Sequence, residues 1–145
     1  MFAGASEICV LADKNTDVNQ VASSLVSQAE HDIDSQCILI TQDEKIISKV
    51  IIQIKKILKT LPRKNIAKKS LVKNGLIILS KNDKQTVDII NEIASEHLEL
   101  NIKNFSKYSK KIINAGSICN GSFTPMSLSD YTVGTNHVLP TSGSA

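Results

Sequence analysis

The amino-acid sequence predicts an α/β protein with an open, mostly parallel sheet joined by βαβ crossovers, which is an incomplete Rossmann-like domain. Short apolar runs rich in Ile, Val and Leu alternate with longer segments in which apolar residues recur every three or four positions. That alternation is typical of right-handed βαβ units. The length of 145 residues suits one domain. Because the alternation stops after Cys119, we expect a Rossmann-like domain over 1–119 and an irregular segment over 120–145.

The first βαβ unit has the clearest pattern. The continuous apolar run Glu7–Ala12 predicts a strand that is buried on both faces. Turn residues follow, with Asn15 or Thr16 as the expected N-cap of a helix that ends near His31. Apolar residues at helical spacing form the inner side of that helix: Val18, Val21, Ala22, Leu25, Val26 and Ala29. The run 35–41 then predicts a second buried strand.

The remaining elements continue the alternation. Pro62 ends the second helix, because proline cannot continue a helix in its interior. The expected elements are a helix over 43–61, a strand within 71–80 centred on 76–79, a helix over 83–95, a strand over 98–102, a short helix over 105–111 and a last strand over 112–119. The segment 121–145 has no periodicity and is rich in Gly, Ser, Thr and Pro, so we expect it to be functional or to be held by contacts outside this chain.

The composition argues against several classes of protein. No apolar run approaches the ~18–20 residues that span a bilayer, and the chain does not start with the basic and apolar regions of a secretory signal. Lysines are densest between Lys45 and Lys84, where they form either a nucleic-acid patch or the solvated surface of basic helices. No aromatic residue between Phe2 and Phe105 offers a stacking platform for bases. We therefore expect a cytoplasmic protein with no nucleic-acid and no membrane partner.

The cysteines point to the same compartment. Cys9, Cys37 and Cys119 lie in apolar stretches, and no two of them form a C-x-x-C pair. Buried, reduced thiols of a cytosolic protein are the favoured interpretation, and a disulfide or a thiolate metal site is the alternative.

The three histidines all lie in polar clusters. Gln28 and His31 are three residues apart near the end of the first expected helix, so their side chains share one face. Imidazole suits Zn²⁺, and an amide oxygen is a rarer ligand that can also bind it. The alternative is an ordinary polar helix end, with His31 near the negative end of the helix dipole.

The other two histidines lie further along the chain. Glu96 and His97 occupy a helix-to-strand junction, where they could activate water and move a proton, or could form an exposed polar pair. Neighbours in sequence point to different sides, so we expect the two groups to act separately on one substrate. In the last segment, Asp130 could be a carboxylate ligand and His137 a substrate contact, or both could belong to ordinary turns. The turn after the first strand, 12–15, lacks a glycine-rich phosphate loop, so the sheet alone predicts no nucleotide site.

Together these features resemble the histidinol dehydrogenase family. Five stretches carry the resemblance in family order over nearly the whole chain: Ala3–Glu7, Leu25–Asp32, Glu96–Glu99, Asn114–Ile118 and Asp130–Gly143. The resemblance implies an NAD-dependent, four-electron oxidation of L-histidinol to L-histidine through the aldehyde. It also implies a Zn²⁺ that holds the substrate rather than carrying electrons.

The resemblance assigns roles to particular residues. It implies that Gln28, His31 and Asp130 are zinc ligands. It implies that Glu96 activates the water that attacks the aldehyde-level intermediate and that His97 serves as the base. It implies the following contacts with the substrate: Ser6, Gln28, His31, His97, Asp130 and His137.

The family also sets expectations about what lies outside this chain. Its members are longer at both ends and form homodimers, so the resemblance implies that most NAD contacts and a fourth zinc ligand, a His, are supplied elsewhere. We therefore expect this chain to be the second large domain of a histidinol dehydrogenase, cut from a longer or split gene, and to be inactive and to bind zinc weakly by itself. Two alternatives stay open: a degenerate, non-catalytic remnant, or a generic α/β binding module whose motifs are coincidental.

Overall fold

The fold is a five-stranded, fully parallel sheet with the strand order β3-β2-β1-β4-β5. The structure is a computed structural model and describes residues 6–121. The strands are β1 (Glu7–Ala12), β2 (Gln36–Thr41), β3 (Gly75–Leu79), β4 (His97–Asn101) and β5 (Ser117–Asn120). The predicted α/β class is confirmed, and the sheet that we expected to be mostly parallel is parallel throughout.

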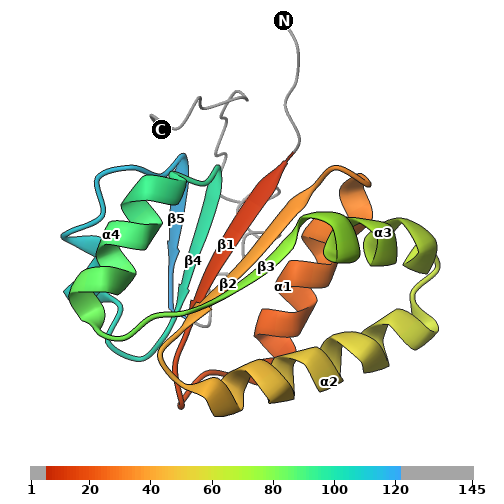
Figure 1. The fold of residues 1–145 in the computed structure, drawn as a ribbon, viewed down its shortest axis with the longest axis horizontal. Coiled ribbons are helices and arrows are strands. Elements are labelled where there is room, and N and C mark those ends of the chain that lie inside the picture. Colours follow the sequence, from red (N-terminus) through yellow and green to blue (C-terminus); the bar gives the residue numbers. More distant parts are fainter. Residues whose placement is uncertain (1–5, 122–145) are drawn as a thin grey trace, which may run out of the picture.

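Helices cover both faces of the sheet (Figure 1). On one face, α1 (Val18–His31), α2 (Glu44–Thr60) and α3 (Lys64–Asn74) enclose a core built on Val10, Leu25 and Val50. On the other face, α4 (Asp83–Ile93) and α5 (Ser106–Ser109) enclose a second core. Burial on both faces explains why β1 and β2 read as continuous apolar runs rather than alternating ones.

The helix starts follow from side-chain capping. Asp17 is the N-cap of α1, where its carboxylate accepts a hydrogen bond from the Asn19 backbone N–H. The prediction of Asn15 or Thr16 at that position was wrong, because the Thr16 hydroxyl instead donates to the Asn101 carbonyl across the sheet edge. Asp43 caps α2 in the same way as Asp17 caps α1.

Two boundaries differ from the predictions. Helix α3 was not predicted, and the segment from Leu71 to Asn74 that we included with the third strand belongs to it. Only Ala67 and Ser70 of α3 are buried, so the helix carries almost no apolar stripe. The last strand begins at Ser117 rather than at residue 112, because the Asn91 side chain accepts hydrogen bonds from the backbone N–H groups of residues 113 and 114 and holds them in a loop.

Strand β4 positions polar side chains inside the molecule. It lies between β1 and β5, and all of its residues are buried. His97, Glu99 and Asn101 are in register with Ile8, Val10 and Ala12, so they share the face on which α1 packs. Polar groups on a central strand are costly unless they are bonded or used.

Two expectations from the composition can be compared with the described part of the chain. Within residues 6–121 no helix is long and apolar enough to cross a membrane. All three cysteines are buried and none of them forms a disulfide in this range, as expected. Burial raises the pKa of the Cys9 and Cys37 thiols to about 12, so both stay protonated at neutral pH.

Candidate active site at the amino edge of the sheet

The predicted functional residues that the structure describes meet at the amino edge of the sheet. Ser6 directly precedes β1, and Glu96 directly precedes β4, its neighbour in the sheet. Helix α1 runs back from the end of β1 to the start of β2, so its last turn, with Gln28 and His31, also lies at this edge (Figure 1). In open α/β sheets ligands usually bind at the opposite, carboxyl edge.

The Glu96 carboxylate is buried and held by two donors. Its side chain is buried, and Oε2 accepts hydrogen bonds from the Ser6 hydroxyl at 2.9 Å and from the Glu7 backbone N–H at 3.1 Å. Two donors on one oxygen fix the orientation of the carboxylate and leave its other oxygen, Oε1, pointing toward His97. The Glu96 carboxylate is therefore preorganised in the absence of any ligand.

The His97 ring is oriented by the backbone of β1. Its Nδ1 lies 3.1 Å from the Glu7 carbonyl oxygen, which can only accept, so Nδ1 carries the proton and Nε2 is the nitrogen that can take one up. Nε2 lies 3.6 Å from Glu96 Oε1, beyond hydrogen-bond distance. The expectation that Glu96 and His97 point to different sides was wrong, because Glu96 precedes the strand and escapes its alternation. Both side chains are also buried, which excludes the alternative of an exposed polar pair.

Two further residues shape the site, and sequence reasoning assigned them no role. Glu7 binds Glu96 and His97 through its backbone, while burial raises the pKa of its own carboxyl, in part offset by a hydrogen bond to the Glu96 backbone. Gly116 packs on the backbone of Glu96: a Cβ at this position would lie 2.6 Å from the Glu96 carbonyl oxygen. A glycine directly before an apolar strand was the available signal for such a close approach.

Among the described residues of the site, the Gln28 side chain is buried near the end of α1. Gln28 is 7% exposed, and within the described residues its Nε2 has no hydrogen-bond partner. A buried amide without a partner is costly, so it marks a group that a ligand can satisfy. His31, one turn further on, is exposed to solvent. Amide and imidazole groups side by side fit a Zn²⁺ site, although residues 6–121 alone bring together no cluster of three His, Cys, Asp or Glu residues.

Asp130 and His137 lie outside the described residues, so their predicted roles stay predictions. A family model described as histidinol dehydrogenase matches residues 1–145. The chain belongs to the histidinol dehydrogenase family. The buried acid–imidazole pair of Glu96 and His97 therefore lies in a chain of this family.

Individual relatives agree with the family match. The chain is 51% identical over 145 residues to the histidinol dehydrogenase of Pelagibacter ubique (strain HTCC1062). It is 52% identical over 145 residues to that of Listeria monocytogenes serovar 1/2a (strain ATCC BAA-679 / EGD-e). It also matches a crystal structure of histidinol dehydrogenase from Elizabethkingia anophelis with a TM-score of 0.92 and 43% identity over 99% of this chain.

The match covers only part of each relative. All of this chain is aligned, but it spans 34% of the Pelagibacter ubique and Listeria monocytogenes proteins and 33% of the Elizabethkingia anophelis structure. The histidinol dehydrogenase fold of these proteins therefore includes large segments that have no counterpart in this chain.

Proposed function

We propose that this chain supplies the catalytic acid–imidazole pair and part of the zinc site of a histidinol dehydrogenase. The reaction is the NAD-dependent oxidation of L-histidinol to L-histidine through histidinaldehyde, which takes place in the cytoplasm. The observation that carries the proposal is the buried arrangement in which Ser6 and the Glu7 backbone orient Glu96 beside His97. Membership of the family supplies the reaction, and this arrangement supplies groups able to move its protons.

Each of the two oxidations releases a proton that a base must take. In the first, bound NAD would supply the hydride acceptor, and the hydroxyl proton of the alcohol would go to Nε2 of His97, the ring nitrogen that the Nδ1 contact leaves as the acceptor. In the second, water would add to the aldehyde carbon as its proton passes to Glu96; loss of a second hydride, for which another NAD would be the acceptor, would leave the carboxylic acid, whose proton goes to solvent. Glu96 and His97 thus act as two bases on one substrate.

Gln28, His31 and Asp130 would hold the zinc ion. The place of Gln28 at the end of α1, one turn before His31, supports this assignment, because its amide oxygen and the imidazole lie on one face of the helix; the amide nitrogen, a donor, would be left to bond the substrate. When bound, zinc supplies a Lewis acid that fixes the imidazole and amine of the substrate. Ser6 and His137 would complete the contacts with L-histidinol, Ser6 through the same hydroxyl that orients Glu96.

We assign no NAD contact to this chain. The turn between β1 and α1, which carries the phosphate-binding glycines in dinucleotide-binding sheets, reads Asp13-Lys14-Asn15-Thr16 here. NAD binding, a fourth zinc ligand and the homodimer contacts would come from the segments that the relatives have in addition.

A chimera tests this function. This chain replaces the matching third of the Pelagibacter ubique relative, and histidinol-dependent NADH formation is measured. We expect an active chimera, and we expect Glu96→Gln and His97→Asn each to lower kcat by about 10²- to 10⁴-fold. The matched control Glu92→Gln removes the same charge from the exposed surface of α4 and should leave the rate unchanged.

Other outcomes of the chimera experiment contradict the proposal in different ways. A folded chimera without activity would favour the non-catalytic remnant. An active chimera that tolerates both substitutions would remove Glu96 and His97 from the mechanism. NADH formation by the 145-residue chain alone would contradict the expectation that it needs the additional segments.

A further inference from the structure

A cavity of about 320 Å³ opens at the carboxyl edge of the sheet, the edge opposite the candidate active site. We propose that this cavity binds a small zwitterion of amino-acid size, with an ammonium group, a carboxylate and an apolar side chain. The volume lies at the lower end of the range for small-molecule sites. No residue of the proposed histidinol dehydrogenase site takes part, so this site is independent of that function.

The cavity lies where open α/β sheets bind ligands. Its floor is formed by Leu11 and Ala12 at the end of β1 and by Ile102 just after β4. From β1 the chain passes through α1 to β2 on one side, and from β4 it passes through α5 to β5 on the other. The strand order therefore reverses between β1 and β4, and a crevice forms outside the carboxyl ends of such a strand pair.

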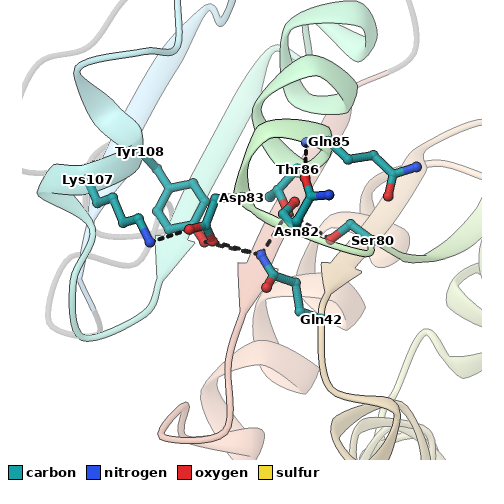
Figure 2. A network of polar contacts seen from close by, with 8 residues as sticks. All are labelled: Gln42, Ser80, Asn82, Asp83, Gln85, Thr86, Lys107 and Tyr108. Carbon is teal, nitrogen blue, oxygen red and sulfur yellow. Dashed lines mark hydrogen bonds and ion pairs between the residues drawn. The ribbon is translucent and has the colours of Figure 1, made fainter.

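One wall of the cavity is rigid because a polar network holds it (Figure 2). The Asp83 carboxylate accepts hydrogen bonds from the Tyr108 hydroxyl and the Gln42 amide, and it pairs with the Lys107 ammonium. Gln42 also donates to Thr86 at 3.1 Å. Bonds from Lys107, Tyr108 and Gln42 hold the pKa of Asp83 well below its usual range. The network ties the starts of α4 and α5 to the end of β2, so the wall is formed before any ligand binds.

Among the charged residues that line the cavity, Lys107 takes part in the network, and Asp13, Lys14 and Asp43 do not. Lys107 is paired with Asp83, whereas Lys14 is exposed and has no ion-pair partner in the described part of the chain. Asp13 and Asp43 each bind a backbone N–H of their own turn through Oδ1, at 2.8 and 2.9 Å, and Oδ2 of each has no partner there. Two carboxylates and one ammonium therefore line the opening.

These charges select the class of ligand. The carboxylates of Asp13 and Asp43 suit an ammonium group, and Lys14 suits a carboxylate. The side chains of Leu11 and Ile102 and the ring of Tyr108 offer apolar surface to the rest of the ligand. A phosphate would meet both aspartates without a glycine-rich loop to receive it, so the charge pattern excludes nucleotides.

The test uses L-leucine and two analogues that each lack one charge, 4-methylpentanoate and 3-methylbutylamine. Each is titrated into the ¹⁵N-labelled 145-residue chain, and the backbone amide signals are followed. We expect L-leucine to shift the signals of Asp13, Lys14 and Asn104, and to bind about fivefold or more tightly than either analogue.

Two variants and one control locate the site. Lys14→Met keeps the aliphatic stem, and Asp43→Asn keeps an N-cap residue for α2, so neither should unfold the chain. Each should raise the dissociation constant of L-leucine about threefold or more, whereas Lys103→Met, a change at another exposed lysine, should leave that constant unchanged.

Three results would overturn the proposal. The first is the absence of shifts in the signals of the cavity residues up to about 10 mM L-leucine, a concentration above the dissociation constant of the weakest binding that would matter. The second is shifts confined to Glu7, Gln28 and His97, which would place the ligand at the amino edge. The third is equal binding of both analogues, which would show that the charges do not select the ligand.

Discussion

Replacing Gly116 with alanine should damage the fold and the candidate site together. The backbone of Gly116 lies directly on Glu96: its N–H donates to the Ser95 carbonyl at 3.1 Å, and the next N–H, of Ser117, donates to the Glu96 carbonyl at 2.8 Å. These two bonds fix the start of β5 against the start of β4. A Cβ on Gly116 would lie 2.6 Å from the Glu96 carbonyl oxygen and 3.3 Å from its Cα.

The size of the effect follows from that contact. A carbon and an oxygen pack without strain at roughly 3.3 Å, so about 0.7 Å of overlap must be absorbed by the backbone. Overpacking of this kind costs about 1–3 kcal/mol, and here the hydrogen bonds between β4 and β5 resist any relief. The displaced residue, Glu96, carries the carboxylate that we propose to be catalytic, and misplacement of about 1 Å can lower a rate about 10²-fold. We therefore expect Gly116→Ala to lose about 2 kcal/mol of stability and most of the chimera's activity.

Urea unfolding of the chain measures the first quantity, and NADH formation by the chimera measures the second. Gly75→Ala is the matched control, since its Cβ would lie 2.2 Å from the Leu71 carbonyl oxygen, at the start of the far edge strand β3. It should lose at least as much stability, because its contact is the closer of the two, while keeping the activity of the folded protein. A Gly116→Ala variant as stable and as active as the parent would refute the close contact. Equal losses of activity in Gly116→Ala and Gly75→Ala would show that the loss comes from reduced stability and not from displacement of Glu96.

Three further predictions follow from particular side chains. Gln28→Leu removes a buried amide whose Nε2 has no partner among residues 6–121, so it should raise the free energy of unfolding of the metal-free chain by about 1 kcal/mol and weaken zinc binding. Gln20→Leu, whose Oε1 also lacks a partner in that range, should leave zinc binding unchanged. Destabilisation by Gln28→Leu would argue against an unpaired amide. Burial and the neighbouring Asp83 raise the pKa of Tyr108 from 10.0 to about 12. Its contribution to the free energy of unfolding is therefore complete below pH 10 and is lost as the pH rises toward 12. In urea titrations at alkaline pH, the Tyr108→Phe variant should lose less free energy of unfolding between pH 10 and 12 than the parent chain. Leu79 is 50% exposed on the edge strand β3, where a second copy of the chain could pair with the sheet. Leu79→Lys should therefore reduce concentration-dependent self-association in sedimentation experiments. Unchanged self-association would show that the copies do not meet at this edge.

Much of the fold could be predicted because burial leaves a local pattern. Strands β1 and β2 lie under helices on both faces, so they appear as uninterrupted apolar runs, and α1 shows its buried stripe at helical spacing. Helix α3 leaves no such pattern, since it buries only Ala67 and Ser70 and is otherwise basic. The start of β5 is set by the side chain of Asn91 in α4, from which it is separated along the chain by β4 and α5, and no short window of sequence reveals that contact.

The candidate site was predictable in its residues but not in its geometry. Glu96 and His97 were identified from their chemistry and from the family resemblance, yet their mutual approach depends on Ser6 and the Glu7 backbone, about 90 positions away. Backbone groups leave no mark on residue identity, because every residue except proline carries the same N–H and C=O. The role of Glu7 could therefore emerge only from the parallel pairing of β1 with β4.

The two edges of the sheet differ in what they can bind, and strand β4 explains the difference. It places His97 at its amino end on the α1 face, and Glu96 precedes it, so proton-transfer groups are buried at that edge. Just past its carboxyl end, Ile102 lines the cavity with apolar surface, and the charged residues of the lining come from the neighbouring loops and from α5. A buried carboxylate and imidazole favour chemistry, since a low dielectric strengthens their interactions, whereas an apolar floor with an exposed rim favours reversible binding. The proposed reaction and the proposed zwitterion site are thus assigned to opposite ends of one strand, and a substitution at either end should leave the other function intact.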